Sequence, residues 1–458
     1  MTRFAEQRSA VRPRRVTIAQ WPGIRAPRLL RAGTETETLA GYHATLPGPV
    51  RARVSLEELA AAAEAIDLRG RGGAGFPFAR KLRAVAEHAE TGGPANVVAN
   101  GEEGEPASAK DRFLLATRPH LVLDGLLLTA DALGAARAVL YVSEPRLAGI
   151  AAAALAENGH AGRVEVFLAP AGYVSGEETS VTRALNGGPA KPVDKPPRPY
   201  QSGVDGRPTL VSNVETFAHL ARAVRLGPNL IAWDGAPGSP GTTLVTVTPD
   251  VGGATLLEVP FGTPMRDVLG HAGVGAPRAL LSGGFFGGFV PQESWAAPIG
   301  HRLMREARLS LGCAALLPLT ESCPVATAAD LLAYFDRENA HQCGACFNGT
   351  AAMARAVARL RDGEAADKDV EALARWSTSL VGRGACGTLD GAAGIVAGLL
   401  GVYGTLVREH LAGVCPLCAG DPHDPAETRF RITWGDLFEE GEPLTRLSRL
   451  RRTHESAR

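Results

Sequence analysis

Short apolar runs alternate with longer segments of helical period over the first half of the chain. Ser55 precedes LEELAAAAEAI, and a serine at the N-cap with Glu58 three positions later predicts the start of a helix. The runs NVVAN (96–100) and AVLYV (138–142) are short and rich in β-branched residues, which predicts buried strands. This alternation indicates an α/β domain over residues 55–238.

The pattern changes after residue 238. Residues 242–269 read as a hairpin, a strand and a helix, which predicts a small β-grasp-like module over residues 239–315. Helical periods dominate residues 316–418, where cysteines fall near the predicted helix ends. Residues 1–54 show no clear period and are predicted to form an extended arm, and residues 419–458 are predicted to form a polar tail.

Composition excludes some classes of function. Basic and acidic residues each number 48, and this zero net charge argues against binding to nucleic acid. The N-terminus lacks the apolar core of a secretory signal, and the apolar stretch 391–407 is glycine-rich and just short of a membrane span. We therefore expect a cytoplasmic chain with no direct membrane span, whose seven cysteines are metal ligands or buried thiols and not disulfides.

A glycine-rich segment, RGRGGAGFP, occupies residues 69–77. Gly70, Gly72 and Gly75 match the pattern G-x-G-x-x-G, in which glycines let the backbone approach phosphate groups. The segment follows a predicted helix and not a strand, so the usual dinucleotide-binding context is missing. A tight turn packed under Phe76 explains the glycines equally well.

Two acidic segments follow along the chain, the first of them directly after a predicted strand. The first, NGEEGEP (100–106), places three carboxylates where they could accept hydrogen bonds from a sugar diol, although a solvated turn would look the same. The second, GEET (176–179), predicts a helix that begins near Glu177. Only five basic residues are lysine, and four of them, Lys81, Lys110, Lys191 and Lys195, lie in or near these segments, which suggests that a compact ammonium group is needed there.

Together these segments resemble the NADH-binding flavoprotein subunit of respiratory complex I and the diaphorase subunits of NAD-linked hydrogenases and formate dehydrogenases. RGRGGAGFP, GEEGEP, GEET and SNVET (212–216) occur in that family's order, and the resemblance extends over residues 55–411. It implies a Rossmann-like FMN/NADH domain, a ubiquitin-like domain of the SLBB type and a helical iron–sulfur domain. It also implies hydride transfer from NADH to FMN, and single-electron transfer to a [4Fe–4S] cluster and on to a ferredoxin-like protein or partner subunit.

The resemblance also implies roles for individual residues. Those expected to contact FMN are Gly70, Arg71, Gly72, Gly73, Lys81, Asn100, Glu102, Asn213 and Thr216, with Gly176 and Glu177 at the helix start beside it. Those expected to contact NADH are Phe76, Glu105, Glu178 and Lys195, and their carboxylates would disfavour the 2′-phosphate of NADPH. Ala84 stands where the family has a second aromatic residue for NADH.

The cysteines depart from the family pattern. Cys343, Cys346 and Cys386 align with three of the four cluster ligands, but Ala340 stands in place of the first. Three interpretations remain open: a [4Fe–4S] cluster whose fourth ligand is His341, Cys415 or Cys418; a zinc ion held by both C-x-x-C pairs; or a lost site with buried thiols. Cys313 and Cys323 are expected in the core. The rival function is that of a non-catalytic or regulatory complex I-like subunit, which retains the fold, binds nucleotide weakly or not at all and could hold a zinc site.

Overall fold

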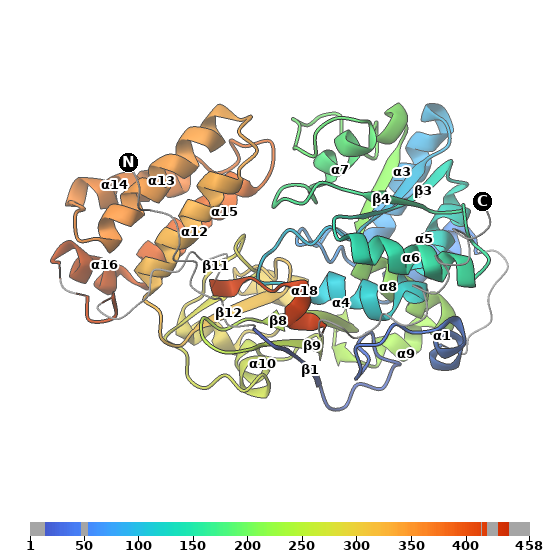
Figure 1. Ribbon diagram of the computed structural model, residues 1–458, viewed down its shortest axis with the longest axis horizontal. Helices are drawn as coiled ribbons and strands as arrows, with labels where there is room; N and C mark the ends of the chain where they lie inside the picture. Colours follow the sequence, from blue (N-terminus) through green and yellow to red (C-terminus); the bar gives the residue numbers. More distant parts are fainter. Residues whose placement is uncertain (1–13, 47–53, 414, 419–428, 439–458) are drawn as a thin grey trace, which may run out of the picture.

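The computed structural model describes residues 14–46, 54–413, 415–418 and 429–438 (Figure 1). The predicted α/β domain is built on a parallel sheet whose strands are β2 (Asn96–Asn100), β3 (Arg137–Val142), β4 (Glu165–Leu168) and β5 (Thr209–Asn213). The helices that surround it are α1 (Leu39–Thr45), α2 (Leu56–Ala65), α3 (Phe78–Gly92), α4 (Lys110–Thr117), α5 (Pro119–Leu133), α6 (Pro145–Glu157), α7 (Glu178–Leu185), η1 (Val204–Gly206), α8 (Val214–Leu226) and α9 (Pro228–Ala232).

Alternate residues of β2 are buried on opposite faces of this sheet. Val97 and Ala99 belong to a core cluster that includes residues of α3, α4, α5 and α8. Val98 packs on the other face, against Val181 and Ala184 of α7. A strand covered on both faces carries a continuous apolar run, which is why NVVAN shows no alternation.

The order of the strands, β4-β3-β2-β5, reverses direction at β2. The chain moves from β2 outward to β3 and β4, and then returns to place β5 on the opposite side of β2. Open parallel sheets bind ligands outside the carboxyl ends of their strands at such a reversal. Those ends are Asn100 and Asn213, which are register partners in neighbouring strands.

A six-stranded sheet forms the second domain, in the order β1-β9-β8-β12-β10-β11. Its elements are β1 (Val16–Gln20), β8 (Thr242–Val247), β9 (Ala254–Pro260), α10 (Met265–His271), β10 (Ala279–Ser282), β11 (Gly288–Phe289), η2 (Gln292–Ala296), α11 (His301–Glu306) and β12 (Ala315–Leu319), and a separate ribbon pairs β6 (Gly235–Ala236) with β7 (Ser239–Pro240). The β8–β9 hairpin and the helix that follows agree with the sequence prediction.

Two boundaries of this domain differ from the sequence prediction. Residues 16–20, expected in an extended arm, form β1 and pair in parallel with β9. The sheet also continues to residue 319, because β12 pairs with both β8 and β10. Both pairings join segments that are distant along the chain, so no local period could reveal them.

Helices form the third domain, at the left of Figure 1: α12 (Pro324–Glu338), α13 (Gly344–Arg361), α14 (Asp367–Ser379), α15 (Thr388–Val402) and α16 (Gly404–Leu411). Cys323 and Cys343 are the N-cap residues of α12 and α13, so cysteines do fall at helix ends. Residues 429–438, expected in a polar tail, instead return to the core and include α18 (Trp434–Leu437). Phe430 is fully buried there against Phe285.

The apolar stretch at residues 391–407 spans the buried helix α15 and the start of α16. Within the described ranges, no single helix has the length and hydrophobicity needed to cross a membrane. Two bent pairs, α4 with α5 and α15 with α16, pass that test of length and composition only as pairs.

Candidate functional site

The glycine-rich segment forms a closed loop between α2 and α3. A β-bridge joins Arg69 to Pro77, and the Gly70 N–H donates to the Phe76 carbonyl over 2.9 Å. Gly73 and Gly75 have φ of +117° and +61°, values that favour glycine. The loop therefore presents backbone to its surroundings where side chains would otherwise stand.

A cavity of about 440 Å³ opens beside this loop, within the range of small-molecule and cofactor sites. All three domains line it. The first contributes Arg71, Gly72, Gly73, Ala74, Asn100, Glu102, Glu103, Gly104, Glu105, Ser108, Lys110, Asp111, Tyr173, Val174, Gly176, Glu177 and Asn213; the second Gly283, Phe286, Ser310, Gly312 and Cys313; the helical domain Cys386, Gly387 and Thr388.

The carboxyl ends of β2 and β5 form one wall of the cavity, as the reversal of strand order requires. Asn100 Nδ2 donates to the Gly176 carbonyl over 2.7 Å, which ties β2 to the loop before α7. Asn213 caps α8, because its Oδ1 accepts from the Glu215 N–H over 2.9 Å. The Arg71 N–H donates to Thr216 Oγ1 over 3.0 Å, so the first turn of α8 also positions the glycine loop.

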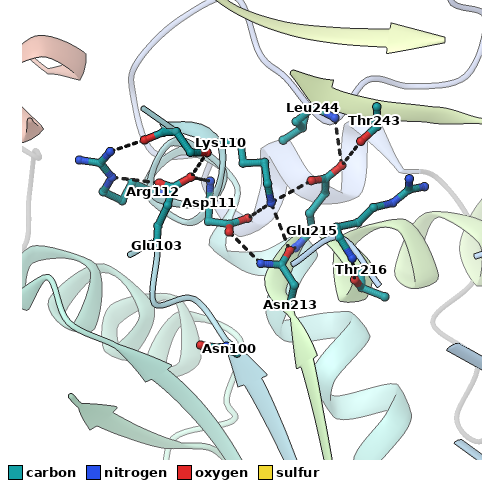
Figure 2. A network of polar contacts seen from close by, with 12 residues as sticks. Asn100, Glu103, Lys110, Asp111, Arg112, Asn213, Glu215, Thr216, Thr243 and Leu244 are labelled. Carbon is teal, nitrogen blue, oxygen red and sulfur yellow. Dashed lines mark hydrogen bonds and ion pairs between the residues drawn. The ribbon is translucent and has the colours of Figure 1, made fainter. Parts of the chain in front are cut away.

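A buried ion network stands behind this wall (Figure 2). Lys110 Nζ lies 2.7 Å from Asp111 Oδ1, 3.1 Å from Glu215 Oε2 and 3.4 Å from Asn213 Oδ1. Burial would lower the pKa of Lys110, but Asp111 and Glu215 outweigh it and raise that pKa. The sequence motifs do not assign Lys110 or Glu215 to the site, although the rarity of lysine singles out Lys110.

Glu103 fixes the start of α4 in the same network. Its carboxylate accepts from the backbone N–H groups of Asp111 and Arg112, over 3.1 and 3.2 Å, and from Arg112 Nε over 2.9 Å. Arg112 first, and then Lys110, outweigh the effect of burial and lower the pKa of Glu103. Glu103 is therefore a structural anion, and only part of the acidic segment is left to face a ligand.

Glu102 and Glu105 are the two carboxyl groups of the cavity whose pKa burial raises to about 7. Glu105 accepts from the backbone N–H groups of Phe285 and Ala107, so it joins the first domain to the second. Glu102 Oε2 is buried and has no hydrogen-bond partner among the described residues. Glu102 can therefore meet a ligand, whereas Glu105 already holds the second domain.

Six of the predicted FMN and NADH contacts do not line the cavity itself: Gly70, Phe76, Lys81, Glu178, Lys195 and Thr216. Three of them form a charged cluster around α7. Glu178 lies 3.7 Å from the ammonium groups of Lys81 and Lys195 and 3.7 Å from the Arg198 guanidinium, and Lys195 Nζ also lies 2.6 Å from Glu177 Oε1. The Phe76 ring is 45% exposed and faces the Arg80 guanidinium.

The three family-like cysteines lie near one another at the start of α13. The Ala385 N–H donates to Cys343 Sγ over 3.4 Å, and burial, then Cys386 and Cys343, raises the pKa of Cys346 to about 12. Cys386 also lines the cavity. The carbonyl of Ala340, the residue that stands in place of the first cluster ligand, accepts from Lys191 Nζ over 3.0 Å.

Cys415 and Cys418 lie elsewhere, so two predictions for them are wrong. They gather with Cys323 and His410 at the N-terminal end of α12, whereas Cys343 follows its C-terminal end. The 15 residues of α12 span about 22 Å. Neither Cys415 nor Cys418 can therefore serve as fourth ligand beside Cys343, and the two C-x-x-C pairs cannot share one zinc ion. Cys323 is buried as expected, but among metal-binding side chains.

The cavity fits a flavin mononucleotide in chemistry. Arg71 lines it with Nε and Nη1 buried and without partners in the described part of the chain, as does Glu102 with Oε2. A cation and a hydrogen-bonding carboxyl group are thus left for a phosphate and for hydroxyl or ring groups. Three neighbouring thiols, of which Cys386 lines the same cavity, suit three corners of an iron–sulfur cluster.

The comparisons with known proteins agree with this arrangement. A family model described as "Nuo51 FMN-binding domain" matches residues 63–222, and one described as "NADH-ubiquinone oxidoreductase-F iron-sulfur binding region" matches residues 326–410. These matches confirm the predicted order of an FMN-binding domain and an iron–sulfur region.

Among solved structures, the chain is similar to NAD⁺-reducing [NiFe]-hydrogenase. In the H₂-reduced state the TM-score is 0.69 at 29% identity, with 79% of this chain and 63% of the hydrogenase chain covered. In the air-oxidised state the TM-score is 0.70 at 28% identity, with 85% and 67% covered. The chain thus spans about two thirds of the hydrogenase chain.

Two relatives, both F-type subunits of NADH-quinone oxidoreductase, extend over most of the chain. The one in Rhizobium meliloti (strain 1021) is 31% identical over 348 residues, which cover 71% of this chain and 82% of the relative. The one in Rhodobacter capsulatus is 30% identical over 371 residues, which cover 76% and 86%. With more than four fifths of these relatives matched, the chain belongs to the family of F-type subunits of NADH-quinone oxidoreductases, flavoproteins with an FMN-binding domain and an iron–sulfur region.

Proposed function

We propose that this chain is an FMN-dependent NADH dehydrogenase module, which oxidises NADH and delivers single electrons through an iron–sulfur cluster to a protein partner. The observation that carries the proposal is the shared cavity: the glycine loop of the first domain and Cys386 of the helical domain line the same space. The proposed FMN-binding loop and the proposed cluster ligand are thus adjacent, as transfer of electrons from flavin to cluster needs.

The FMN end of the cavity would be formed by the glycine loop and by the carboxyl ends of β2 and β5. Gly72 and Gly73 leave room for the cofactor, and the unpartnered guanidinium nitrogens of Arg71 supply positive charge for its phosphate. Asn100 and Asn213 offer amide groups to its hydroxyls. FMN held there would supply the chemistry that couples the two-electron oxidation of NADH to the release of single electrons.

The NADH end would be formed by the loop before α7 and the charged cluster beside it. Glu177 and Glu178 could accept hydrogen bonds from the ribose hydroxyls, and a carboxylate at that position disfavours a 2′-phosphate. Lys81, Lys195 and Arg198 pair with these glutamates, which holds the carboxylates in place for the diol. No catalytic acid or base from the chain is needed for hydride transfer.

The electron-accepting end would be the cluster held by Cys343, Cys346 and Cys386. Ala340 cannot act as a ligand, so we propose that His341, the remaining candidate, or a non-protein donor completes the site. The two relatives are named as subunits of NADH-quinone oxidoreductase, which supports an electron-accepting partner subunit or a ferredoxin-like protein as the next carrier.

The test is a visible spectrum of the anaerobically purified chain before and after NADH. We expect noncovalent FMN, iron and acid-labile sulfide, and loss of the flavin absorption on addition of NADH. Cys386→Ser should lose the iron chromophore and keep FMN. A colourless chain that added FMN cannot reconstitute would contradict the proposal and favour the non-catalytic alternative.

A further inference from the structure

Four side chains with metal-binding atoms gather outside the cavity, where α16 approaches the start of α12. They are Cys323, His410, Cys415 and Cys418, and their ligand atoms all lie within 4.8 Å of one another. Cys323 and His410 are buried, and the other two are half-buried. Cys415 and Cys418 also form a C-x-x-C pair, a spacing that is common in zinc sites.

The distances within this group match a single tetrahedral ion. Zn–S bonds of about 2.3 Å place two tetrahedral sulfurs about 3.8 Å apart, and a Zn–N bond of about 2.0 Å places sulfur and nitrogen about 3.5 Å apart. In the structure, Cys323 Sγ lies 3.9 Å from Cys415 Sγ. His410 Nε2 lies 3.3 Å from Cys323 Sγ and 3.7 Å from Cys418 Sγ.

Three cysteines and one histidine could also bind an iron–sulfur cluster, but the short distances between their ligand atoms favour a single ion. A four-iron cube binds each ligand at a different iron, with sulfide and other irons between them. Its ligands therefore lie farther apart than those around a single ion. The thiols of Cys343, Cys346 and Cys386 do not form such a tight group, although they lie in one region.

The groups around the four side chains orient them for a metal. His410 Nδ1 lies 3.2 Å from the Leu360 carbonyl oxygen, which can only accept, so Nδ1 carries the hydrogen. Nε2 then has a free lone pair for a metal ion, and it is the nitrogen that faces the thiols. Cys323 is the N-cap residue of α12, and the positive end of the helix dipole favours a metal-bound thiolate at that position.

We propose that Cys323, His410, Cys415 and Cys418 form a structural zinc site, separate from the iron–sulfur site at the other end of α12. Four protein ligands leave no open position for water or substrate, so the site is structural and not catalytic. It would join the end of α16 and the segment after it to the start of α12. The neighbouring Ser322 Oγ accepts from Arg429 over 2.8 Å, so the same corner also receives the returning C-terminal segment.

The test measures the zinc and iron contents of the 458-residue chain and of variants at each of the two sites. Wild-type protein should contain about one zinc ion per chain in addition to iron. Cys418→Ser and His410→Gln should lose more than about nine tenths of the zinc and keep FMN and iron. Cys346→Ser, the matched control, should lose iron and keep zinc. Loss of iron and sulfide from Cys418→Ser, with zinc absent from the wild type, would overturn the proposal.

A second measurement does not depend on how well the variants fold. Wild-type chain produced with Co²⁺ in place of Zn²⁺ should show the thiolate charge-transfer and visible d–d bands of a tetrahedral site. Added Zn²⁺ should remove those bands and leave the flavin spectrum unchanged. A wild-type chain without these bands, whose Cys323, Cys415 and Cys418 react freely with a thiol reagent, would overturn the proposal as well.

Discussion

At the residue scale, burial and charge pairing give similar side chains different tasks. Arg112 and Lys110 lower the pKa of Glu103 and hold it ionised, whereas burial raises the pKa of Glu102 and Glu105 to about 7. All three come from one acidic segment. The sequence could show that carboxylates cluster there, but not which of them would be paired, because the partners come from α4 and from the second domain.

Glu178 is the residue on which nucleotide choice is expected to depend. Glu178→Gln would leave Lys81, Lys195 and Arg198 with one carboxylate fewer, so the site would attract a 2′-phosphate. We expect the ratio of kcat/KM for NADPH to that for NADH to rise about tenfold, or about 1.4 kcal/mol. Steady-state kinetics with both nucleotides measure this ratio, and Glu87→Gln, at an exposed position on α3, is the control. An unchanged ratio would show that Glu178 does not determine the choice between NADH and NADPH.

The raised pKa of Glu102 predicts that the free energy of unfolding of the chain depends on pH. This pKa rises on folding from 4.5 to about 7, so the folded chain binds a proton that the unfolded chain releases. This contribution to stability is fully present below pH 4.5 and is lost as pH rises through about 7. At pH 8, Glu102→Gln should therefore stabilise the flavin-free chain by on the order of 2–3 kcal/mol, and at pH 4.5 hardly at all.

Denaturant unfolding of the Glu102 variant at both pH values measures this difference. Glu90→Gln, an exposed position on α3, is the control and should show no such dependence on pH. Equal effects of Glu102→Gln at the two pH values would mean that Glu102 is ionised in the folded chain at neutral pH.

At the scale of elements, the site is formed where the ends of strands and the starts of helices meet. Asn100 ends β2, Asn213 ends β5 and caps α8, and Lys110 begins α4. The helix predicted from Ser55 has its capping box, and α7 begins at Glu178 as the GEET segment predicts. Local signals thus located the elements. The pairing that brings Asn100 beside Asn213 joins strands that are more than 100 residues apart and left no local signal.

Lys110 is the cation that Asp111 of α4 and Glu215 of α8 share at this place. Lys110→Met keeps the length of the side chain but leaves Asp111 and Glu215 buried without their shared cation. Breaking a buried pair in this way costs about 3–5 kcal/mol. Urea unfolding should show that loss, whereas Lys368→Met, at an exposed position on α14, should stay within about 0.5 kcal/mol of wild type. A small loss for Lys110→Met would show that the two acids are neutral in the folded chain.

At the scale of the whole molecule, three domains meet around one cavity, and the first and last described segments of the chain both pack onto them. Residues 16–20 complete the six-stranded sheet, and residues 429–438 pack on the core (Figure 1). Ile432 accepts from Arg112 and its N–H donates to the Pro106 carbonyl, so the C-terminal segment touches the segment that carries the site acids.

Phe430 tests how far that segment contributes to stability. It is fully buried and packs edge-on against Phe285, so Phe430→Ala should cost about 3–5 kcal/mol through lost burial and the cavity left behind. Leu168→Ala, at a side chain that is 51% exposed, should cost much less. Thermal unfolding in parallel compares the two, and equal losses would show that the packing of the returning segment adds little.

The sequence by itself determined the class of the protein. Its periods located the α/β, β-rich and helical parts, and its glycine and acidic motifs identified the family, because such motifs depend on local backbone needs and on order along the chain. The tertiary structure decided which side chains and strands contact one another. Cys415 and Cys418 face Cys323 and His410 and not Cys343, because the full length of α12 lies between the two groups. Lys110 pairs with Glu215, and β1 pairs with β9, because those contacts form only when distant segments fold together.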